Sequence, residues 1–151
     1  VHSAWTADPN DPSVFTVHPD DVEILEAYAN AVTAFYRAAT SDLVVTAADF
    51  APYMADAGRQ FTASLEQASS DGYVDDLGSG IVLRPYVLAD QRSATSAIIL
   101  DCTISDEQFV LRSAPERVPS SPVLRGQLTT MVVVDGAWKV DVFAEEPTAC
   151  L

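Results

Sequence analysis

Two kinds of hydrophobic periodicity divide the chain at about Gly72. Before this residue, apolar side chains recur at the spacing of an α-helix, and after it they alternate with polar ones in short runs separated by turn residues. A run of helices followed by a run of strands is typical of an α+β fold with an antiparallel sheet. We therefore expect a single domain over residues 20–151. Residues 1–19 contain three prolines and lack helical periodicity, so we expect an extended leader or linker arm there.

The clearest predicted element is a helix that begins at Asp20 or Asp21 and ends before Thr40. Either aspartate is a good N-cap, and Glu23 adds negative charge where the helix dipole favours it. Apolar side chains recur along this helix at the spacing of one buried stripe, formed by Leu25, Tyr28, Val32, Phe35, Tyr36 and Ala39.

Two further helices are predicted between Thr46 and Gly72. The sequence Thr46-Ala-Ala-Asp49 resembles a capping box with Asp in place of Glu, and it begins a short helix that runs to about residue 54. A third helix covers about residues 55–68 and places Phe61 on its apolar face. The Asp71-Gly72 pair then ends the helical part of the chain.

Six strands are predicted after Gly72, at residues 73–77, 81–88, 93–104, 108–112, 124–134 and 137–143. Pro85 lies inside the second of these, which indicates a sheet edge or a bulge. Asp135-Gly136 separates the last two strands and is the strongest hairpin signal in the chain. The segment 113–122, which contains three prolines, is expected to be a loop.

The chain is strongly acidic, because 22 Asp and Glu residues stand against eight Lys and Arg, for a formal net charge of −14. Binding to a nucleic acid or to an anionic membrane surface requires a basic face, so the composition argues against both partners. The strongly apolar runs are only a few residues long, far short of the roughly 20 that a membrane-spanning helix needs. We interpret the acidity as a solvated surface that keeps the molecules apart.

The two cysteines, Cys102 and Cys150, lie in different surroundings. Cys102 falls inside the predicted strand 93–104, whereas Cys150 is the penultimate residue, where a thiol gains little from packing because chain ends fray. A disulfide that ties the tail to the sheet accounts for the position of Cys150 and indicates an oxidising compartment. The alternative is two unrelated thiols, one buried and one at the chain end. The pair has no CxxC spacing, so it does not resemble a metal site.

The order of these elements, together with the closing sequence Asp135-Gly-Ala-Trp-Lys-Val140, resembles the NTF2-like (SnoaL-like) superfamily. A narrower resemblance is to small secreted or lipid-anchored actinobacterial proteins of this fold, most of which have no assigned function. In those proteins an Asp-Cys pair in a central strand, here Asp101-Cys102, is matched by a cysteine near the C-terminus, here Cys150. The resemblance covers about residues 20–150.

This resemblance implies that the N-terminal helices pack in the concavity of a strongly curved antiparallel sheet, giving the cone of cystatin-like and NTF2-like folds. It also implies an apolar pocket inside the cone, and the aromatic residues that we assign to it are Tyr28, Phe35, Tyr53, Phe61 and Tyr86. It implies no particular activity, because this fold hosts enzymes, binding proteins and assembly modules.

Enzymes of the superfamily place acid–base groups inside the cone, and several use a His–Asp pair. The two histidines of this chain, His2 and His18, both lie in the leader, which argues against a histidine mechanism. An isomerase-like site needs only a carboxylate base and a hydroxyl donor, for which the weak candidates are Asp101, Asp49 and Tyr53. Because 22 acidic residues make such combinations common by chance, we interpret these side chains as caps, core or solvated groups and assign no catalytic residue.

Asp101 is the most informative of these acids, because its strand carries apolar residues on both faces. An inward carboxylate would be a pocket base or a buried structural acceptor. We expect it to point outward, next to the disulfide. The acidic cluster of Asp71, Asp75 and Asp76 lacks the ligand pattern of a calcium loop, and no phosphate-binding or zinc motif appears, so we expect no cofactor or metal.

Competing functions therefore remain open. The favoured hypothesis is a non-catalytic exported domain that binds a small apolar ligand or a protein partner, including a second copy through its sheet face, with residues 1–19 as a tether. The alternative is a small-molecule isomerase, dehydratase or cyclase with an Asp–Tyr pair in the cone, and a third is a module of a larger assembly. A core filled by Phe35, Phe61 and Met54 would exclude the enzyme. Two convergent ionisable groups with shifted pKa values in an open cone would weigh against the non-catalytic hypothesis.

Overall fold

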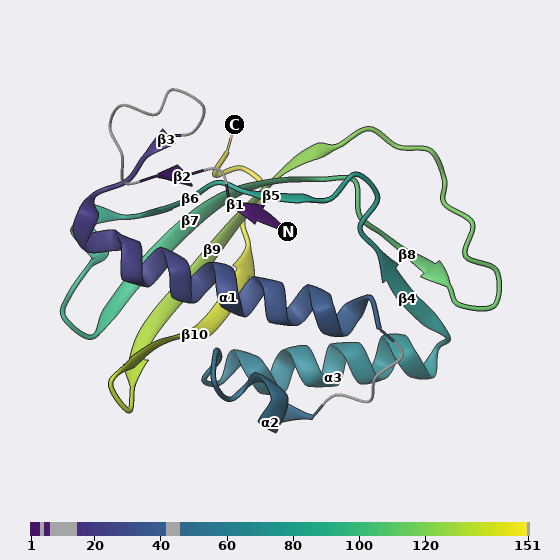
Figure 1. Ribbon diagram of the computed structural model, residues 1–151, viewed down its shortest axis with the longest axis horizontal. Coiled ribbons are helices and arrows are strands. Elements are labelled where there is room, and N and C mark those ends of the chain that lie inside the picture. Colours follow the sequence, from purple (N-terminus) through teal and green to yellow (C-terminus); the bar gives the residue numbers. More distant parts are fainter. Residues whose placement is uncertain (4, 7–14, 42–45, 151) are drawn as a thin grey trace.

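The structure is a computed structural model that describes residues 1–3, 5–6, 15–41 and 46–150, and its helices precede its long strands as the periodicity predicts (Figure 1). The helices are α1 (Val22–Ala39), α2 (Ala47–Phe50) and α3 (Ala57–Ser70), with 3-10 turns at Pro19–Asp21 and Ala89–Gln91. The later strands are β4 (Tyr73–Asp76), β5 (Ile81–Leu83), β6 (Pro85–Val87), β7 (Ser96–Ser105), β8 (Gln108–Leu111), β9 (Val123–Val134) and β10 (Ala137–Glu145). Three two-residue strands precede them: β1 (His2–Ser3), β2 (Trp5–Thr6) and β3 (Phe15–Thr16).

The main sheet has the strand order β1-β5-β7-β9-β10, and β6 also pairs with β7. All of its pairs are antiparallel except β1 with β5, which is parallel. The expectation of a purely antiparallel sheet is therefore wrong at one edge, because the N-terminal segment adds a strand that the periodicity did not predict. The fold is α+β, with helices packed against a mixed sheet.

The segment 1–19 contacts the domain through His2–Ser3 and Val17, whereas its strands β2 and β3 pair with each other. His2–Ser3 pairs with Val82 and Leu83 of β5, and Val17 is only 7% exposed within the hydrophobic core. Residues 4 and 7–14, which make up much of the predicted leader, lie outside the described part of the chain.

Helix α1 crosses one face of the main sheet, and α3 lies beside it near β10 (Figure 1). The predicted stripe of α1 packs into the core, since its members Leu25, Tyr28, Val32, Tyr36 and Ala39 are buried. The connection between α2 and α3 runs along the edge strand β10, where the Ala55 N–H donates to the Val140 carbonyl at 2.7 Å. This contact covers an edge that would otherwise expose unpaired backbone groups.

The predicted strand 81–88 is divided at Arg84 into β5 and β6. The Arg84 N–H does not continue a regular ladder, because it donates to Asp101 Oδ1 at 2.7 Å. Pro85 follows directly, so the irregularity that its missing N–H predicts lies at this position. Strands β4 and β8 leave the main sheet and form a separate antiparallel ribbon beside α3 (Figure 1).

The Asp135-Gly136 hairpin forms as predicted, with φ of 53° at Asp135 and 79° at Gly136. Positive φ at both central positions gives the turn a twist that matches the flanking strands, and the sequence Asp-Gly tolerates it. Strand β10 pairs along its length with residues 127–134 of β9, with a register shift between Val140 and Val142.

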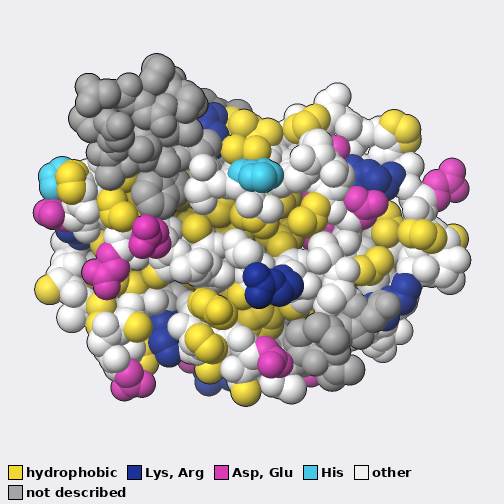
Figure 2. Space-filling view, viewed as in Figure 1, with side chains coloured by type: hydrophobic (Ala, Val, Ile, Leu, Met, Phe, Trp, Pro, Cys, Tyr) yellow, Lys and Arg dark blue, Asp and Glu magenta, His cyan; other side chains and the backbone are white. Residues whose placement is uncertain are grey.

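The predicted disulfide joins Cys102 in β7 to Cys150, with the sulfurs 2.09 Å apart, so the C-terminal tail is tied to the sheet. Close approach of this tail requires Gly126 in β9, because a side chain there would collide with the Glu146 carbonyl. None of the helices among the described residues is long and apolar enough to span a membrane. On the face shown in Figure 2, basic side chains are scattered singly among acidic and apolar ones.

Candidate functional site

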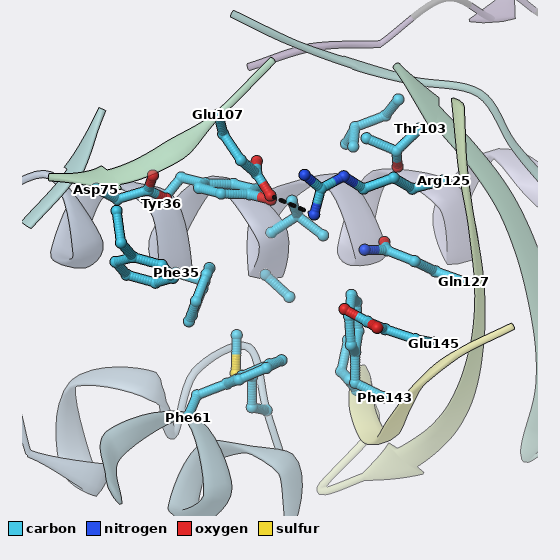
Figure 3. Close-up of a pocket in the computed structure, with 16 residues that line it drawn as sticks. Phe35, Tyr36, Phe61, Asp75, Thr103, Glu107, Arg125, Gln127, Phe143 and Glu145 are labelled. Carbon is cyan, nitrogen blue, oxygen red and sulfur yellow. Dashed lines mark ion pairs between the residues drawn. The ribbon is translucent and has the colours of Figure 1, made fainter. Parts of the chain in front are cut away.

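A cavity of about 290 Å³ opens between α1, α3, β4 and the face of the main sheet that the helices cover (Figure 3). One side of it is an aromatic wall, which we define as Phe35, Phe61 and Phe143. The Phe61 ring centroid lies 4.7 Å from that of Phe35 and 5.3 Å from that of Phe143, so α1, α3 and β10 meet through these rings. Met54 also lines the cavity. The aromatic residues and Met54 therefore leave space between them, and the filled core that would exclude an enzyme is not formed.

The opposite side is a polar wall, which we define as Tyr36, Asp75, Glu107 and Arg125 (Figure 3). These side chains come from α1, β4, the β7–β8 connection and β9, so only the tertiary fold brings them together. Arg125 Nη1 lies 3.6 Å from Glu107 Oε1. The side chains of Thr103, Gln127 and Glu145 complete the polar lining.

Asp75 is the deepest carboxylate of the polar wall. It is only 6% exposed, and its Oδ1 has no hydrogen-bond partner among the described residues. Burial raises its pKa to about 7, and the negative charges of Glu107 and Asp76 contribute in the same direction, while Arg125 and a hydrogen bond from the Asp76 backbone N–H act against them. A carboxyl group that titrates near neutral pH can either accept or donate a proton under physiological conditions.

Tyr36 lies against the same groups. Burial raises the pKa of its hydroxyl well above the ordinary value, and the charge of Glu107 and a hydrogen bond to that carboxylate add to the effect. Its ring also contacts Phe35 edge to face at 5.2 Å, because the two residues are consecutive in α1 and straddle the boundary between the two walls. The hydroxyl stays protonated and can serve as a hydrogen-bond donor in the cavity.

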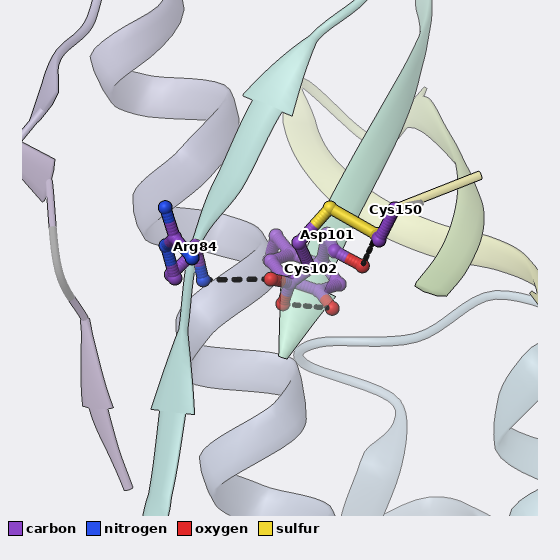
Figure 4. The surroundings of a disulfide bond; sticks show 5 residues. Arg84, Asp101, Cys102 and Cys150 are labelled. Atoms are coloured by element: carbon purple, nitrogen blue, oxygen red, sulfur yellow. Dashed lines mark hydrogen bonds between the residues drawn. A yellow bond between two sulfur atoms is a disulfide. The ribbon is translucent and has the colours of Figure 1, made fainter. Parts of the chain in front are cut away.

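Asp101 points inward, so the expectation of an outward carboxylate is wrong. It is 0% exposed, accepts a hydrogen bond from the Tyr28 hydroxyl at 2.8 Å and another from the Arg84 N–H at 2.7 Å (Figure 4). The alternation of β7 puts Asp101 on the helix-covered face and Cys102 on the opposite one, where the C-terminal tail packs. Because consecutive residues of a strand point to opposite faces, the outward Cys102 of the disulfide goes together with an inward Asp101.

Burial raises the pKa of the Asp101 carboxyl, and its hydrogen bonds act in the opposite direction. The Asp101 and Tyr28 side chains are not among the residues that line the cavity, and both are fully buried. We interpret this pair as the structural acceptor and donor that hold α1 against the irregular strand at Arg84.

The other aromatic residues assigned to the pocket divide into two groups. Phe35 and Phe61 line the cavity, whereas Tyr53 and Tyr86 are 36% and 42% exposed and do not. Asp49 is an exposed cap, whose Oδ2 accepts from the Thr46 N–H at 2.6 Å, so the capping box is confirmed.

The polar wall itself was not predicted. Asp75 entered the sequence analysis only as one of an acidic cluster, and the alternation of β4 does not single it out, because Tyr73 on the same face is exposed. Glu107, Arg125 and Tyr36 carry no signal that separates them from other acids, arginines and core aromatics. Within the described residues, no group of three or more His, Cys, Asp or Glu side chains could hold a metal ion.

Neither the models of known protein families nor the curated proteins give a match to this sequence. The fold and the cavity define the class of protein: an α+β domain with a disulfide and a lined internal cavity.

Proposed function

We propose that this domain binds a small, largely apolar molecule in the cavity between α1, α3 and the sheet. The observation that carries the proposal is the division of the cavity into an aromatic wall and a polar wall. Ligand sites are typically concave and mostly apolar, with a few convergent polar groups that fix orientation. The volume of about 290 Å³ lies at the small end of the range for such sites, which favours a ligand the size of one or two rings.

We further propose that the fold is an NTF2-like cone and that the protein is exported. The helices on one face of the sheet and the Asp135-Gly136 hairpin support an NTF2-like cone, in which such a cavity is expected from the resemblance. The Cys102–Cys150 bond supports an exported protein, because disulfides persist in oxidising compartments.

Binding can be tested with indole as a neutral, mainly apolar probe, by two-dimensional NMR and isothermal titration calorimetry. Ala31 lines the cavity and is fully buried, so Ala31→Leu should fill the space and abolish binding. Asn30→Leu adds the same side chain at the exposed neighbouring position of α1 and should leave binding unchanged. Indole binding that survives Ala31→Leu, or shifts confined to residues outside the cavity, would contradict the proposal.

Proton-transfer catalysis is a second candidate function, favoured by the position of Asp75 beside Tyr36. A carboxyl with a pKa of about 7 and a protonated phenol are the two groups that an isomerase-like reaction needs, and both lie in one cavity. By the criterion stated from the sequence, this convergence weighs against a purely non-catalytic domain. The pair differs from the candidates Asp101, Asp49 and Tyr53.

A direct test is the exchange of the α-protons of 2-tetralone with deuterium, followed by NMR with and without the protein. Catalysis through Asp75 should accelerate the exchange, and Asp75→Asn should remove the acceleration while indole still binds. The catalytic candidate is rejected if the wild-type protein binds 2-tetralone without accelerating exchange above the buffer rate.

A further inference from the structure

The charges around the cavity are unbalanced. Asp75, Glu107 and Glu145 contribute three carboxylates to the lining, and Arg125 contributes the single guanidinium among the lining residues. The nearest approach of that guanidinium to a lining carboxylate is the 3.6 Å separation from Glu107 Oε1, which is long for a charge-assisted hydrogen bond. The lining therefore has an excess of acceptors over donors.

Asp75 carries an acceptor oxygen of this lining that lacks a donor within the described part of the chain. Asp75 lines the cavity, and its buried Oδ1 has no hydrogen-bond partner among the described residues. A buried acceptor without a donor costs free energy, about 1–3 kcal/mol in typical cases, and a bound molecule that supplies the donor would remove this cost. The ligand should therefore present N–H or O–H groups toward Asp75.

The aromatic wall favours a ligand with an apolar body, and the carboxylates favour a cationic donor over a neutral one. The rings of Phe35, Phe61 and Phe143 supply the apolar contact surface of the cavity (Figure 3). The net charge of −14 adds a long-range field that attracts cations and repels anions.

We propose that the ligand is an organic amine with an apolar body, bound as its ammonium ion with the nitrogen at Asp75 and Glu107 and the body against the aromatic wall. The assignment rests on the proposed function, because it names the ligand class of that same cavity. The ammonium supplies the donors that the lining lacks, and its charge offsets the carboxylate excess.

A pH dependence follows from the groups that face Asp75, which are Glu107, Asp76, Tyr36 and Arg125. Asp75 is ionised only above a pKa of about 7, whereas an alkyl ammonium stays protonated to about pH 9 or higher. Affinity for the amine should therefore rise as the pH increases from 6 to 8, and affinity for a neutral analogue should not.

The experiment uses three ligands with one phenyl body: 2-phenylethylamine, 2-phenylethanol and 3-phenylpropionate, titrated calorimetrically at pH 8. We expect the amine to bind about ten-fold more tightly than the alcohol, and the carboxylate to bind most weakly, because the lining carboxylates strengthen the hydrogen bonds of an ammonium and repel an anion. Asp75→Asn and Glu107→Gln should each lower amine affinity toward that of the alcohol, without changing alcohol affinity. Either variant alone suffices if the other does not fold, as judged by circular dichroism.

The matched control is Glu116→Gln, which also removes one negative charge but lies exposed in the loop between β8 and β9. It should leave the preference for the amine intact. Equal or tighter binding of the alcohol or the carboxylate would overturn the amine assignment while leaving the cavity as a ligand site. If none of the three ligands binds, the proposed function itself fails.

Discussion

Two buried aspartates of this molecule face the helix-covered side of the fold, and each lies near a tyrosine of α1. Asp101 is enclosed by hydrogen bonds, from the Tyr28 hydroxyl and from the Arg84 N–H, and does not line the cavity. Asp75 lines the cavity, has an unpartnered oxygen among the described residues, and is repelled by Glu107.

The difference separates a structural role from a functional one. Burial raises the pKa of both carboxyls, but hydrogen bonds oppose the effect at Asp101, whereas at Asp75 neighbouring negative charges reinforce it and outweigh the opposing effects of Arg125 and of the Asp76 backbone N–H. A satisfied buried carboxylate stabilises one arrangement of helix and strand. An unsatisfied one beside open space is a cost to the folded chain alone, and a ligand can offset it.

The largest expected effect on stability concerns the Cys102–Cys150 disulfide, which lies next to Asp101. Reduction of Cys102–Cys150 should lower the free energy of unfolding by about 4 kcal/mol, because it removes the constraint on the unfolded chain, and should lower Tm by about 10 °C. Differential scanning calorimetry with and without a phosphine reductant measures both. The Cys102→Ala, Cys150→Ala double variant should not respond to the reductant. An unchanged Tm under full reduction would remove the support for an oxidising compartment.

The second largest effect on stability is expected from substitution of Asp101, the hydrogen-bonded carboxylate. Asp101→Leu leaves the Tyr28 hydroxyl and the Arg84 N–H buried without an acceptor, so it should destabilise the protein by about 3 kcal/mol in urea denaturation. Adding Tyr28→Phe removes one of the orphaned donors, and the double variant should be more stable than the sum of the single effects predicts. Strict additivity would show that the two residues do not act as a pair.

Asp75, whose Oδ1 lacks a partner among the described residues, should change the pH dependence of the free energy of unfolding. Its native pKa of about 7 exceeds the ordinary value near 4, so the native state binds a proton more tightly than the unfolded state between these limits. Stability should therefore fall as the pH rises through that window. Relative to Asp75→Asn, the wild-type protein should lose about 2 kcal/mol between pH 5 and pH 8. Parallel urea-unfolding profiles for the two proteins would contradict the raised pKa.

The smallest effect is expected at a tyrosine outside both sites. Tyr86 is exposed and does not line the cavity, so Tyr86→Phe should change stability by less than about 0.5 kcal/mol and leave indole binding unchanged. Phe61→Ala, which removes part of the aromatic wall, should weaken the same binding. Equal loss of binding in both variants would place the ligand elsewhere on the molecule.

Local signals were sufficient for several parts of this protein. The stripe of α1, the capping box at Thr46 and Asp49, and the Asp135-Gly136 turn form as expected, because side-chain spacing and backbone preference act over a few residues. The disulfide was also predicted, because a cysteine at the chain end gains little from packing unless it is bonded to the rest of the fold.

Only the tertiary structure decided the site. The polar wall joins residues from α1, β4, β9 and the β7–β8 connection, and none of them differs in its local sequence from ordinary surface or core positions. The direction of Asp101 likewise depends on what covers each face of β7, because both faces carry apolar residues. Long-range packing sets burial and the distances between charges, and these two quantities, which a one-dimensional pattern does not contain, separate Asp75 from the other acids of the chain.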